Sequence, residues 1–181
     1  MDGSPFPTMK REMENLPKRK STRLKEFDYS QFGYYFITIC IKNRREFFSN
    51  IVGTNLVLTK FGNIVDEIWQ NLPEYYNVEL DNYVIMPDHF RGIIIIDNYP
   101  DVGDRSNKKY HNLSEIIGKF KSYTTRKIKE CLIEKKNFEW QKSFYDRIIR
   151  DENELYQIRK YIEENPLSWD IDRNNPKNIE M

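Results

Sequence analysis

Tyr-Val-Ile-Met-Pro-Asp-His-Phe-Arg-Gly-Ile-Ile-Ile-Ile, residues 83–96, is the stretch that decides the fold of this chain. Two β-branched apolar runs flank its Met-Pro-Asp-His segment, so the pattern predicts two strands joined by a tight connection. The second run, Ile93 to Ile96, is apolar without alternation, as expected of a central strand covered on both faces. Because side chains alternate along a strand, His89 and Arg91 should share one face and Phe90 should lie on the other. A polar pair on a buried strand is costly unless it is used, so we expect a functional site here.

Strand and helix patterns continue on both sides of this pair. Strongly apolar β-branched and aromatic runs predict strands, and apolar residues at three- and four-residue spacing predict helices. The expected strands are 34–41, 78–80, 83–87, 91–96 and a segment within 138–149, and the expected helices are 59–71, a segment from 113 onward and 151–165. Thr59 and either Asn112 or Ser114 are the expected N-caps. This order predicts an α+β, ferredoxin-like fold, with an antiparallel sheet and helices mainly on one face.

The composition is that of one soluble domain with a real core. Charged residues make up 31% of the 181-residue sequence and aromatic residues 14%, which excludes a disordered chain, and the net charge of +1 gives no global argument for nucleic acid. Lys and Arg are nevertheless concentrated near the N-terminus and along residues 113–136, where solvated surface is the simpler alternative to DNA contact. We expect a flexible basic arm at 1–22, a single domain at 23–173 and a tail at 174–181.

The two cysteines make neither a disulfide framework nor a zinc-type cluster. The first residues lack the basic and apolar regions of a signal peptide. No run approaches the ~18 consecutive apolar residues of a membrane span. These features predict a cytoplasmic protein with no membrane partner.

Tyr161 and Asn165 form a second polar pair, on the last predicted helix. Their i, i+4 spacing places them on one helix face, so a helix packed beside the His89 strand brings a phenol, an imidazole, a guanidinium and a carboxamide together. A tyrosine hydroxyl can attack a phosphodiester and form a covalent phosphotyrosine, helped by a cation that polarises the phosphate. Each residue also has a structural explanation: a core tyrosine, a helix-ending Asn before Pro166, and a structural histidine.

Two motifs resemble a known family. Met-Pro-Asp-His-Phe-Arg-Gly-Ile-Ile at 86–94 resembles the Met-Pro-Asn-His-hydrophobic-His core of the HUH-class single-tyrosine transposases. Tyr-Ile-Glu-Glu-Asn-Pro-Leu-Ser-Trp at 161–169 resembles the C-terminal signature of their REP-associated tyrosine transposase branch. Four more stretches are similar to that branch, at 23–29, 34–40, 118–122 and 140–146. The likeness covers residues 20 to 173 in the right order, which makes it specific.

This resemblance implies a ferredoxin-like domain that binds hairpin-forming single-stranded DNA and cleaves it through a 5′-phosphotyrosine. Position by position, it makes Tyr161 the nucleophile, His89 a ligand of a divalent metal (Mg²⁺ or Mn²⁺), and Asn165 a third, amide-type ligand. In related transposases two protomers pair and the tyrosine helix can serve the partner's metal site. The resemblance therefore also implies a homodimer.

Two positions depart from the family pattern. Asp88 stands where Asn is usual, and strand alternation points it away from the His89 face unless the connection bends. Arg91 stands where the second His is expected. Because arginine stays protonated and offers no lone pair, it cannot ligate a metal and repels one. The loss of one ligand and the added positive charge should weaken the metal site.

Two hypotheses follow from Arg91. In the first, Arg91 contacts the scissile phosphate in place of the missing cation, and Tyr161, His89 and Arg91 are the catalytic residues of a slow or metal-independent nuclease. In the second, the chain is a catalytically inactive, repurposed protein that binds DNA hairpins. A third interpretation, an ordinary α+β enzyme or partner-binding domain, predicts absent or salt-insensitive binding to such DNA.

DNA contacts are expected from basic side chains that reach phosphates. They are Lys18, Arg19 and Arg23 on the arm, and Lys119, Lys121, Arg126 and Lys127 on the predicted helix after 113. The aromatic residues Tyr123, Trp140 and Tyr145 are candidates to stack on unpaired bases, with core packing as the alternative for each.

Overall fold

A computed structural model describes residues 27–52, 55–98, 110–132, 138–167 and 169. The predicted limits of the N-terminal arm and the C-terminal tail lie outside these ranges, as do the arm residues Lys18, Arg19 and Arg23.

The main sheet has four antiparallel strands in the order β4-β5-β1-β6. They are β1 (Gly33–Cys40), β4 (Val78–Ile85), β5 (His89–Ile96) and β6 (Tyr145–Ile149). β5 lies between β1 and β4, and β1 lies between β5 and β6, so two β-helix-β units are each split by a strand of the other. This confirms the predicted α+β, ferredoxin-like fold.

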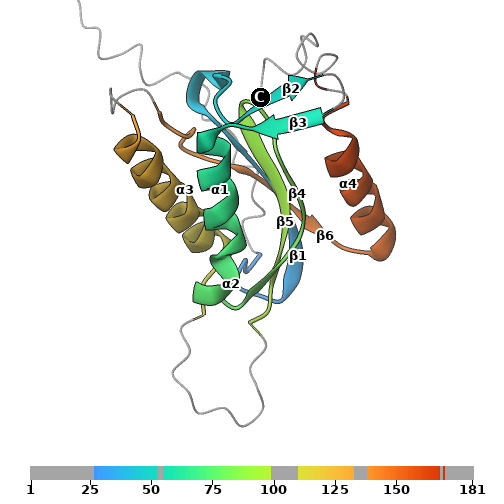
Figure 1. The fold of residues 1–181 in the computed structure, drawn as a ribbon. Coiled ribbons are helices and arrows are strands. Elements are labelled where there is room, and N and C mark those ends of the chain that lie inside the picture. Colours follow the sequence, from blue (N-terminus) through green and yellow to red (C-terminus); the bar gives the residue numbers. More distant parts are fainter. Residues whose placement is uncertain (1–26, 53–54, 99–109, 133–137, 168, 170–181) are drawn as a thin grey trace, which may run out of the picture.

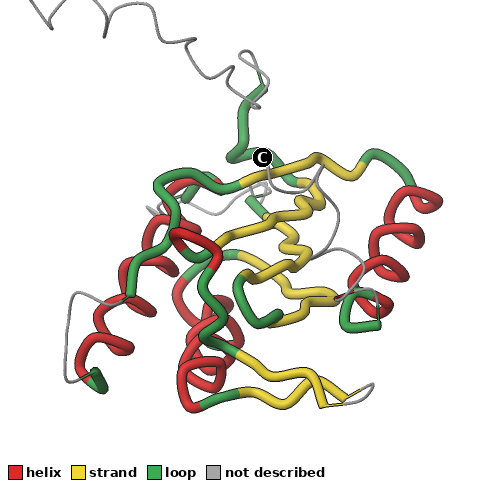
Figure 2. Tube along the Cα trace, turned by 90° about the horizontal axis from the view of Figure 1, so that it is seen from above, coloured by secondary structure: helices red, strands yellow, loops and turns green. Residues whose placement is uncertain are grey.

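Helices cover both faces of the sheet (Figures 1 and 2). Two long helices, α1 (Lys60–Gln70) and α3 (Leu113–Glu130), pack on one face, with the short α2 (Leu72–Tyr75) following α1. Among the described helices, α4 (Glu152–Glu164) is the one that packs on the other face. The helices are therefore mainly on one face, as expected, and the exception is the helix that carries Tyr161.

Local sequence explains where the helices begin. The side chain of Thr59 accepts hydrogen bonds from two backbone N–H groups at the start of α1, which confirms the predicted N-cap. Of the two candidates for α3, Asn112 is the cap, and it forms a reciprocal capping box with Glu115. Asp151 caps α4 by accepting from the N–H of Glu154.

Some strands differ in extent from the prediction. The two segments predicted at 78–80 and 83–87 are one strand, β4, which runs through the polar Asp81 and Asn82 by means of a bulge. β5 begins at His89 rather than at Arg91. Strand pairing overrides the weak β propensity of these polar residues, because β5 supplies partners along nearly all of β4. Residues between η2 (Lys42–Arg44) and α1 form a separate hairpin of β2 (Ser49–Val52) and β3 (Asn55–Leu58).

The sheet separates two apolar cores of unequal size. The larger one lies under α1 and α3 and is built around aromatic residues such as Trp69, Phe90 and Phe120. The smaller one, under α4, consists of Phe36, Ile93, Ile149, Leu155, Ile158 and Ile162. Within the described ranges, no helix is both long and apolar enough to cross a membrane.

Candidate active site

The predicted alternation along β5 is present. Phe90 points to the larger core, with its ring centroid 4.6 Å from that of Trp69 and 5.5 Å from that of Phe120. Its neighbours in the alternation, His89 and Arg91, therefore lie on the opposite face, which is the face that α4 covers. The structure thus brings the polar pair of the central strand to the helix that carries Tyr161 and Asn165.

Arg91 and Tyr161 are in direct contact. The guanidinium carbon of Arg91 lies 4.8 Å from the centroid of the Tyr161 ring, a cation–π distance. The tyrosine ring also meets Phe36 of β1 edge to face, with centroids 6.3 Å apart. Tyr161 keeps 43% of its surface exposed, so its hydroxyl can meet a ligand from solvent while its ring is held against the sheet.

Asp88 orients the ring of His89, and this corrects the expectation that Asp88 points away. The connection bends, and Asp88 Oδ1 lies 2.5 Å from His89 Nδ1. The other carboxylate oxygen, Oδ2, lies 2.8 Å from Nε of Arg44. Arg44 reaches this position from η2, where its φ of 51° is left-handed. Because a carboxylate only accepts hydrogen bonds, Nδ1 of His89 carries the proton and donates it to Asp88.

His89 is a neutral imidazole with a free lone pair. Burial is the main cause that lowers its pKa to about 4; the positive charge of Arg91 lowers it further, and the hydrogen bond to Asp88 acts in the opposite direction. With the proton on Nδ1, the lone pair is on Nε2. That atom is buried and has no hydrogen-bond partner among the described residues. A buried acceptor without a partner indicates a site that a ligand completes.

Asn165 provides a second buried acceptor of this kind. It ends α4, is only 2% exposed, and its Oδ1 has no hydrogen-bond partner among the described residues. From the Arg91–Tyr161 contact, His89 lies two residues along β5 (~6.6 Å) and Asn165 one turn along α4 (~5.4 Å). Trp169, just beyond Asn165, has its ring centroid 6.0 Å from that of His89. The two acceptors therefore lie on the same side of the Arg91–Tyr161 pair.

These donor types fit a divalent metal at two positions. A neutral imidazole nitrogen and an amide oxygen both ligate Mn²⁺, and the amide oxygen suits Mg²⁺ as well. Arg91 does not fit, because its guanidinium is a permanent positive charge on the same face of the sheet as His89. The described residues contain no group of three or more His, Cys, Asp or Glu side chains that could hold a metal ion. The two donor atoms that fit, His89 Nε2 and Asn165 Oδ1, are both uncharged.

The predicted basic residues on α3 lie away from this site. α3 packs on the opposite face of the sheet, where Lys119, Arg126 and Lys127 are exposed. Lys121 is different, because its ammonium donates to the backbone carbonyls of Gln141 at 2.6 Å and Lys142 at 3.0 Å. Partial burial lowers its pKa. Lys121 therefore links α3 to the segment before β6 by hydrogen bonds.

The three candidate stacking residues differ in burial and in the face of the sheet on which they lie. Trp140 is 7% exposed and donates from Nε1 to Thr124 Oγ1, so it is a core residue and not a stacking surface. Tyr123 is exposed on α3 beside the guanidinium of Arg126, whose carbon lies 5.0 Å from the ring centroid. Tyr145 is exposed on β6 and shares a sheet row with Arg91, since both pair with Thr38. Of the three, Tyr145 is the one on the side of the candidate active site.

The match to a known protein family covers these site residues. The sequence profile of the family described as "Transposase IS200 like" matches residues 29–165, which include both strands of the central pair and all of α4. The chain belongs to the IS200-like transposase family. The resemblance inferred from the two motifs is thereby confirmed.

Individual proteins similar to this IS200-like transposase agree. An uncharacterized protein of Haemophilus influenzae is 37% identical over 169 residues, which cover 86% of this chain and 92% of that protein. A second H. influenzae protein, named "Putative REP-associated tyrosine transposase", is 28% identical over 148 residues, or 77% of this chain and 73% of that protein. The solved structure of a REP-associated tyrosine transposase bound to a REP hairpin has a TM-score of 0.58 at 20% identity, covering 83% of this chain and 74% of that one, and shows the shared fold.

Some residues of the site left no signal in the sequence. Nothing in the spacing of Arg44 points to Asp88, because the two residues lie on separate segments of the chain. Trp169 was part of the C-terminal motif, but its packing on His89 could not be inferred from the motif. Asp88 departs from the family pattern, and its contact with Nδ1 makes it the group that orients His89.

Proposed function

We propose that this IS200-like transposase binds hairpin-forming single-stranded DNA and cleaves and rejoins it through a 5′-phosphotyrosine on Tyr161. The observation that carries the proposal is the contact of Tyr161 with Arg91, which sets a half-exposed nucleophile beside a fixed positive charge. Family membership supports the reaction class. The fold shared with a transposase that is bound to a REP hairpin supports the choice of DNA.

In the proposed reaction the hydroxyl oxygen of Tyr161 attacks the phosphorus of the scissile phosphodiester. A bond forms between that oxygen and phosphorus, the bond from phosphorus to the 3′ oxygen breaks, and the phenol proton ends on the released 3′ hydroxyl by way of solvent. The product holds one phosphodiester bond for the one that was broken, so the reverse attack by a 3′ hydroxyl rejoins DNA without another energy source.

Arg91 and His89 have separate tasks in this proposal. Arg91 donates hydrogen bonds to the non-bridging phosphate oxygens and stabilises the negative charge that develops on them. His89 stays neutral, and Asp88 keeps its Nε2 lone pair directed into the site. When Mg²⁺ or Mn²⁺ is bound, His89 and Asn165 would hold it, and the ion would polarise the scissile phosphate.

We propose two contact areas for the DNA. Exposed Lys119, Arg126 and Lys127 on α3 bind phosphates of the hairpin stem. Tyr145 stacks on an unpaired base next to the scissile phosphate, because it is exposed on the same face of the sheet as Arg91. Since α3 and Tyr145 lie on opposite faces, the DNA must pass around an edge of the sheet to touch both.

A second candidate function is a hairpin-binding protein without nuclease activity. Arg91 favours it, because the position of the second motif histidine holds a side chain that cannot ligate a metal. Both candidates bind the same DNA and differ only in whether Tyr161 becomes covalently attached.

A covalent adduct separates the two candidates. Purified protein is incubated with an end-labelled single-stranded hairpin DNA, with and without Mn²⁺, and resolved on a denaturing gel. Tyr161→Phe and Arg91→His are run beside it. Tyr156→Phe serves as the matched control, because Tyr156 is on the same helix and 61% exposed but lies outside the contacts described above.

Each outcome decides between the candidates. An adduct that persists in Tyr156→Phe and disappears in Tyr161→Phe establishes the nuclease. An adduct that forms only in Arg91→His establishes a binding protein whose catalytic scaffold is intact. If no variant forms an adduct and none binds the hairpin, both candidates are wrong.

The homodimer implied by the resemblance stays a proposal. In the described chain α4 packs on its own sheet, so Tyr161 meets the Arg91 of the same chain. We therefore propose that each protomer of a dimer holds a complete site. Light scattering on the purified protein, with and without hairpin DNA, measures the number of copies.

A further inference from the structure

The contacts of α4 with the sheet are of two kinds. Leu155, Ile158 and Ile162 are buried in the smaller core, and such apolar contacts attract without fixing a direction. A helix held only in this way can turn about its axis or shift along it with little loss. Tyr161 is one residue from Ile162, so any such movement displaces its hydroxyl. Directional contacts are needed to hold the tyrosine over Arg91.

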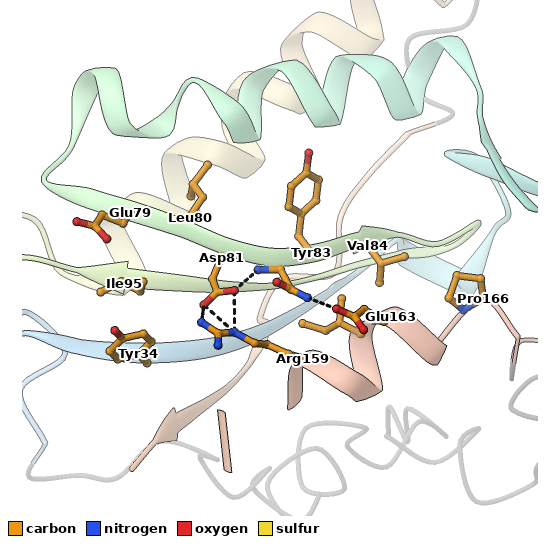
Figure 3. Close-up of a pocket in the computed structure, with 12 residues that line it drawn as sticks. Tyr34, Glu79, Leu80, Asp81, Tyr83, Val84, Ile95, Arg159, Glu163 and Pro166 are labelled. Atoms are coloured by element: carbon orange, nitrogen blue, oxygen red, sulfur yellow. Dashed lines mark hydrogen bonds and ion pairs between the residues drawn. The ribbon is translucent and has the colours of Figure 1, made fainter. Parts of the chain in front are cut away.

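Polar contacts supply that direction. Near the start of α4, Glu154 Oε1 lies 2.5 Å from Nη2 of Arg147 on β6. Two further contacts lie close to Tyr161, and Figure 3 shows them. Arg159 binds Asp81 through two nitrogens, with Nη2 2.6 Å from Oδ2 and Nε 3.1 Å from both carboxylate oxygens. One turn further along α4, Glu163 Oε1 accepts a hydrogen bond of 2.7 Å from Nδ2 of Asn82. These two bulge contacts, Arg159–Asp81 and Glu163–Asn82, lie on either side of Tyr161 in the helix.

Both strand partners come from the bulge in β4. Leu80 pairs with Ile94 and Tyr83 with Gly92, so three steps along β4 match two along β5. Between these two pairs β5 has one residue, Ile93, and β4 has two, Asp81 and Asn82. Ile93 faces α4. In a regular strand, consecutive side chains point to opposite faces. The extra residue allows both side chains to reach the same helix.

The Arg159–Asp81 contact is a partly buried ion pair, in which the Arg159 side chain is 42% exposed. The Asp81 side chain is only 10% exposed and sits in an open groove of about 850 Å³ between β4 and α4. Burial alone would raise the pKa of Asp81, but the hydrogen bonds from Arg159 and from the Asn82 backbone, together with the charge of Arg159, hold it below its usual value. A two-nitrogen arginine–carboxylate pair fixes orientation as well as distance.

We propose that Asp81 and Asn82 are positioning residues for Tyr161: the bulge contacts fix the rotation and the axial position of α4, and thereby hold the nucleophile over Arg91. This inference rests on the proposed function for the role of Tyr161. It explains why β4 carries a polar bulge at the point where α4 contacts it.

The test uses charge reversal in the full chain. Arg159→Asp sets two carboxylates against each other, and Asp81→Arg combined with Arg159→Asp restores the pair in the opposite sense. Lys160→Asp is the matched control: it makes the same charge change on the next residue, whose exposed ammonium pairs only weakly with Glu164 at 3.7 Å. Asn82→Asp tests the second contact by placing a carboxylate opposite Glu163.

Two measurements are made on each variant. The first is the single-turnover rate of adduct formation with labelled hairpin DNA, beside the dissociation constant for the same DNA. The second is the ¹⁹F resonance of 3-fluorotyrosine incorporated at position 161, which reports the surroundings of that ring without any reaction. Circular dichroism melts show which variants fold.

We expect Arg159→Asp to form the adduct roughly 100-fold more slowly than Lys160→Asp at a similar dissociation constant, because a displacement of about 1 Å has that effect on a reacting group. Its ¹⁹F resonance should move toward the position seen in urea. The double reversal should recover both. Equal rates and equal resonances in Arg159→Asp and Lys160→Asp would overturn the proposal, as would a double reversal whose resonance stays displaced.

The proposed function and the positioning role fail in different ways. If the natural chain forms no adduct, cleavage by Tyr161 is wrong, and the ¹⁹F resonances alone decide whether the bulge contacts position the ring. If Arg159→Asp does not fold, the ¹⁹F resonance of the double reversal is compared with that of the natural chain, and a displaced resonance overturns the proposal.

Discussion

The burial of neutral His89 predicts a pH dependence of stability that a single substitution removes. Its pKa is lowered from 6.5 to about 4, chiefly by burial. Between these values the unfolded chain binds a proton that the folded chain does not, so the free energy of unfolding must fall as the pH falls. At ~1.36 kcal/mol per pH unit, the full loss is about 3 kcal/mol, reached near pH 4 and absent above pH 7.

Urea unfolding followed by tryptophan fluorescence measures this loss at intervals from pH 7 to pH 5. The comparison is with His89→Asn, whose amide can still donate to Asp88 but does not titrate. Carboxylates with lowered pKa values, such as Asp28 and Asp81, lose their contribution below about pH 4, outside this range. We expect a slope approaching 1.4 kcal/mol per pH unit in the natural chain and a flatter line in the variant. Parallel lines would refute the burial of a neutral His89.

Four further substitutions have defined outcomes. Arg91→His should raise the affinity for Mn²⁺ by at least ~10-fold in calorimetry, because a cation becomes a ligand; unchanged affinity would contradict the proposed ligand positions. Lys121→Met should lower the free energy of unfolding by about 1–2 kcal/mol, whereas Lys119→Met should leave the melting temperature unchanged and reduce the salt dependence of hairpin binding by about one phosphate contact; the reverse pattern would contradict their assigned roles. Gly62→Ala should lower the free energy of unfolding by about 3 kcal/mol in urea melts, because its Cβ would lie 2.1 Å from the carbonyl oxygen of Phe48; a loss under about 1 kcal/mol would show that the loop yields easily.

Local patterns predicted those features that depend on neighbouring residues along the chain. The caps Thr59 and Asn112, the helix and strand order, and the opposite directions of Phe90 and His89 all follow from short-range geometry. The motifs supplied the family, and with it the pairing of Tyr161 with the central strand.

Features that depend on long-range contacts were not predictable in this way. The orientation of Asp88 depends on Arg44 in a left-handed turn of another segment. The shared direction of Asp81 and Asn82 depends on an extra residue that appears only when β4 pairs with β5. Lys121 looks like any other lysine of a basic helix until the carbonyls it binds are known. Spacing within one element cannot reveal partners on another.

The sheet keeps chemistry and folding largely apart. None of the candidate catalytic residues belongs to the larger core that α1 and α3 bury, and the helix with Tyr161 stands over a small core of its own. Substitutions on that side can therefore accumulate over generations at little risk to the scaffold, since selection removes chiefly the changes that push a protein below its stability threshold. A chain built in this way can exchange a histidine for Arg91, change or lose its reaction, and still survive as a folded protein available for another use.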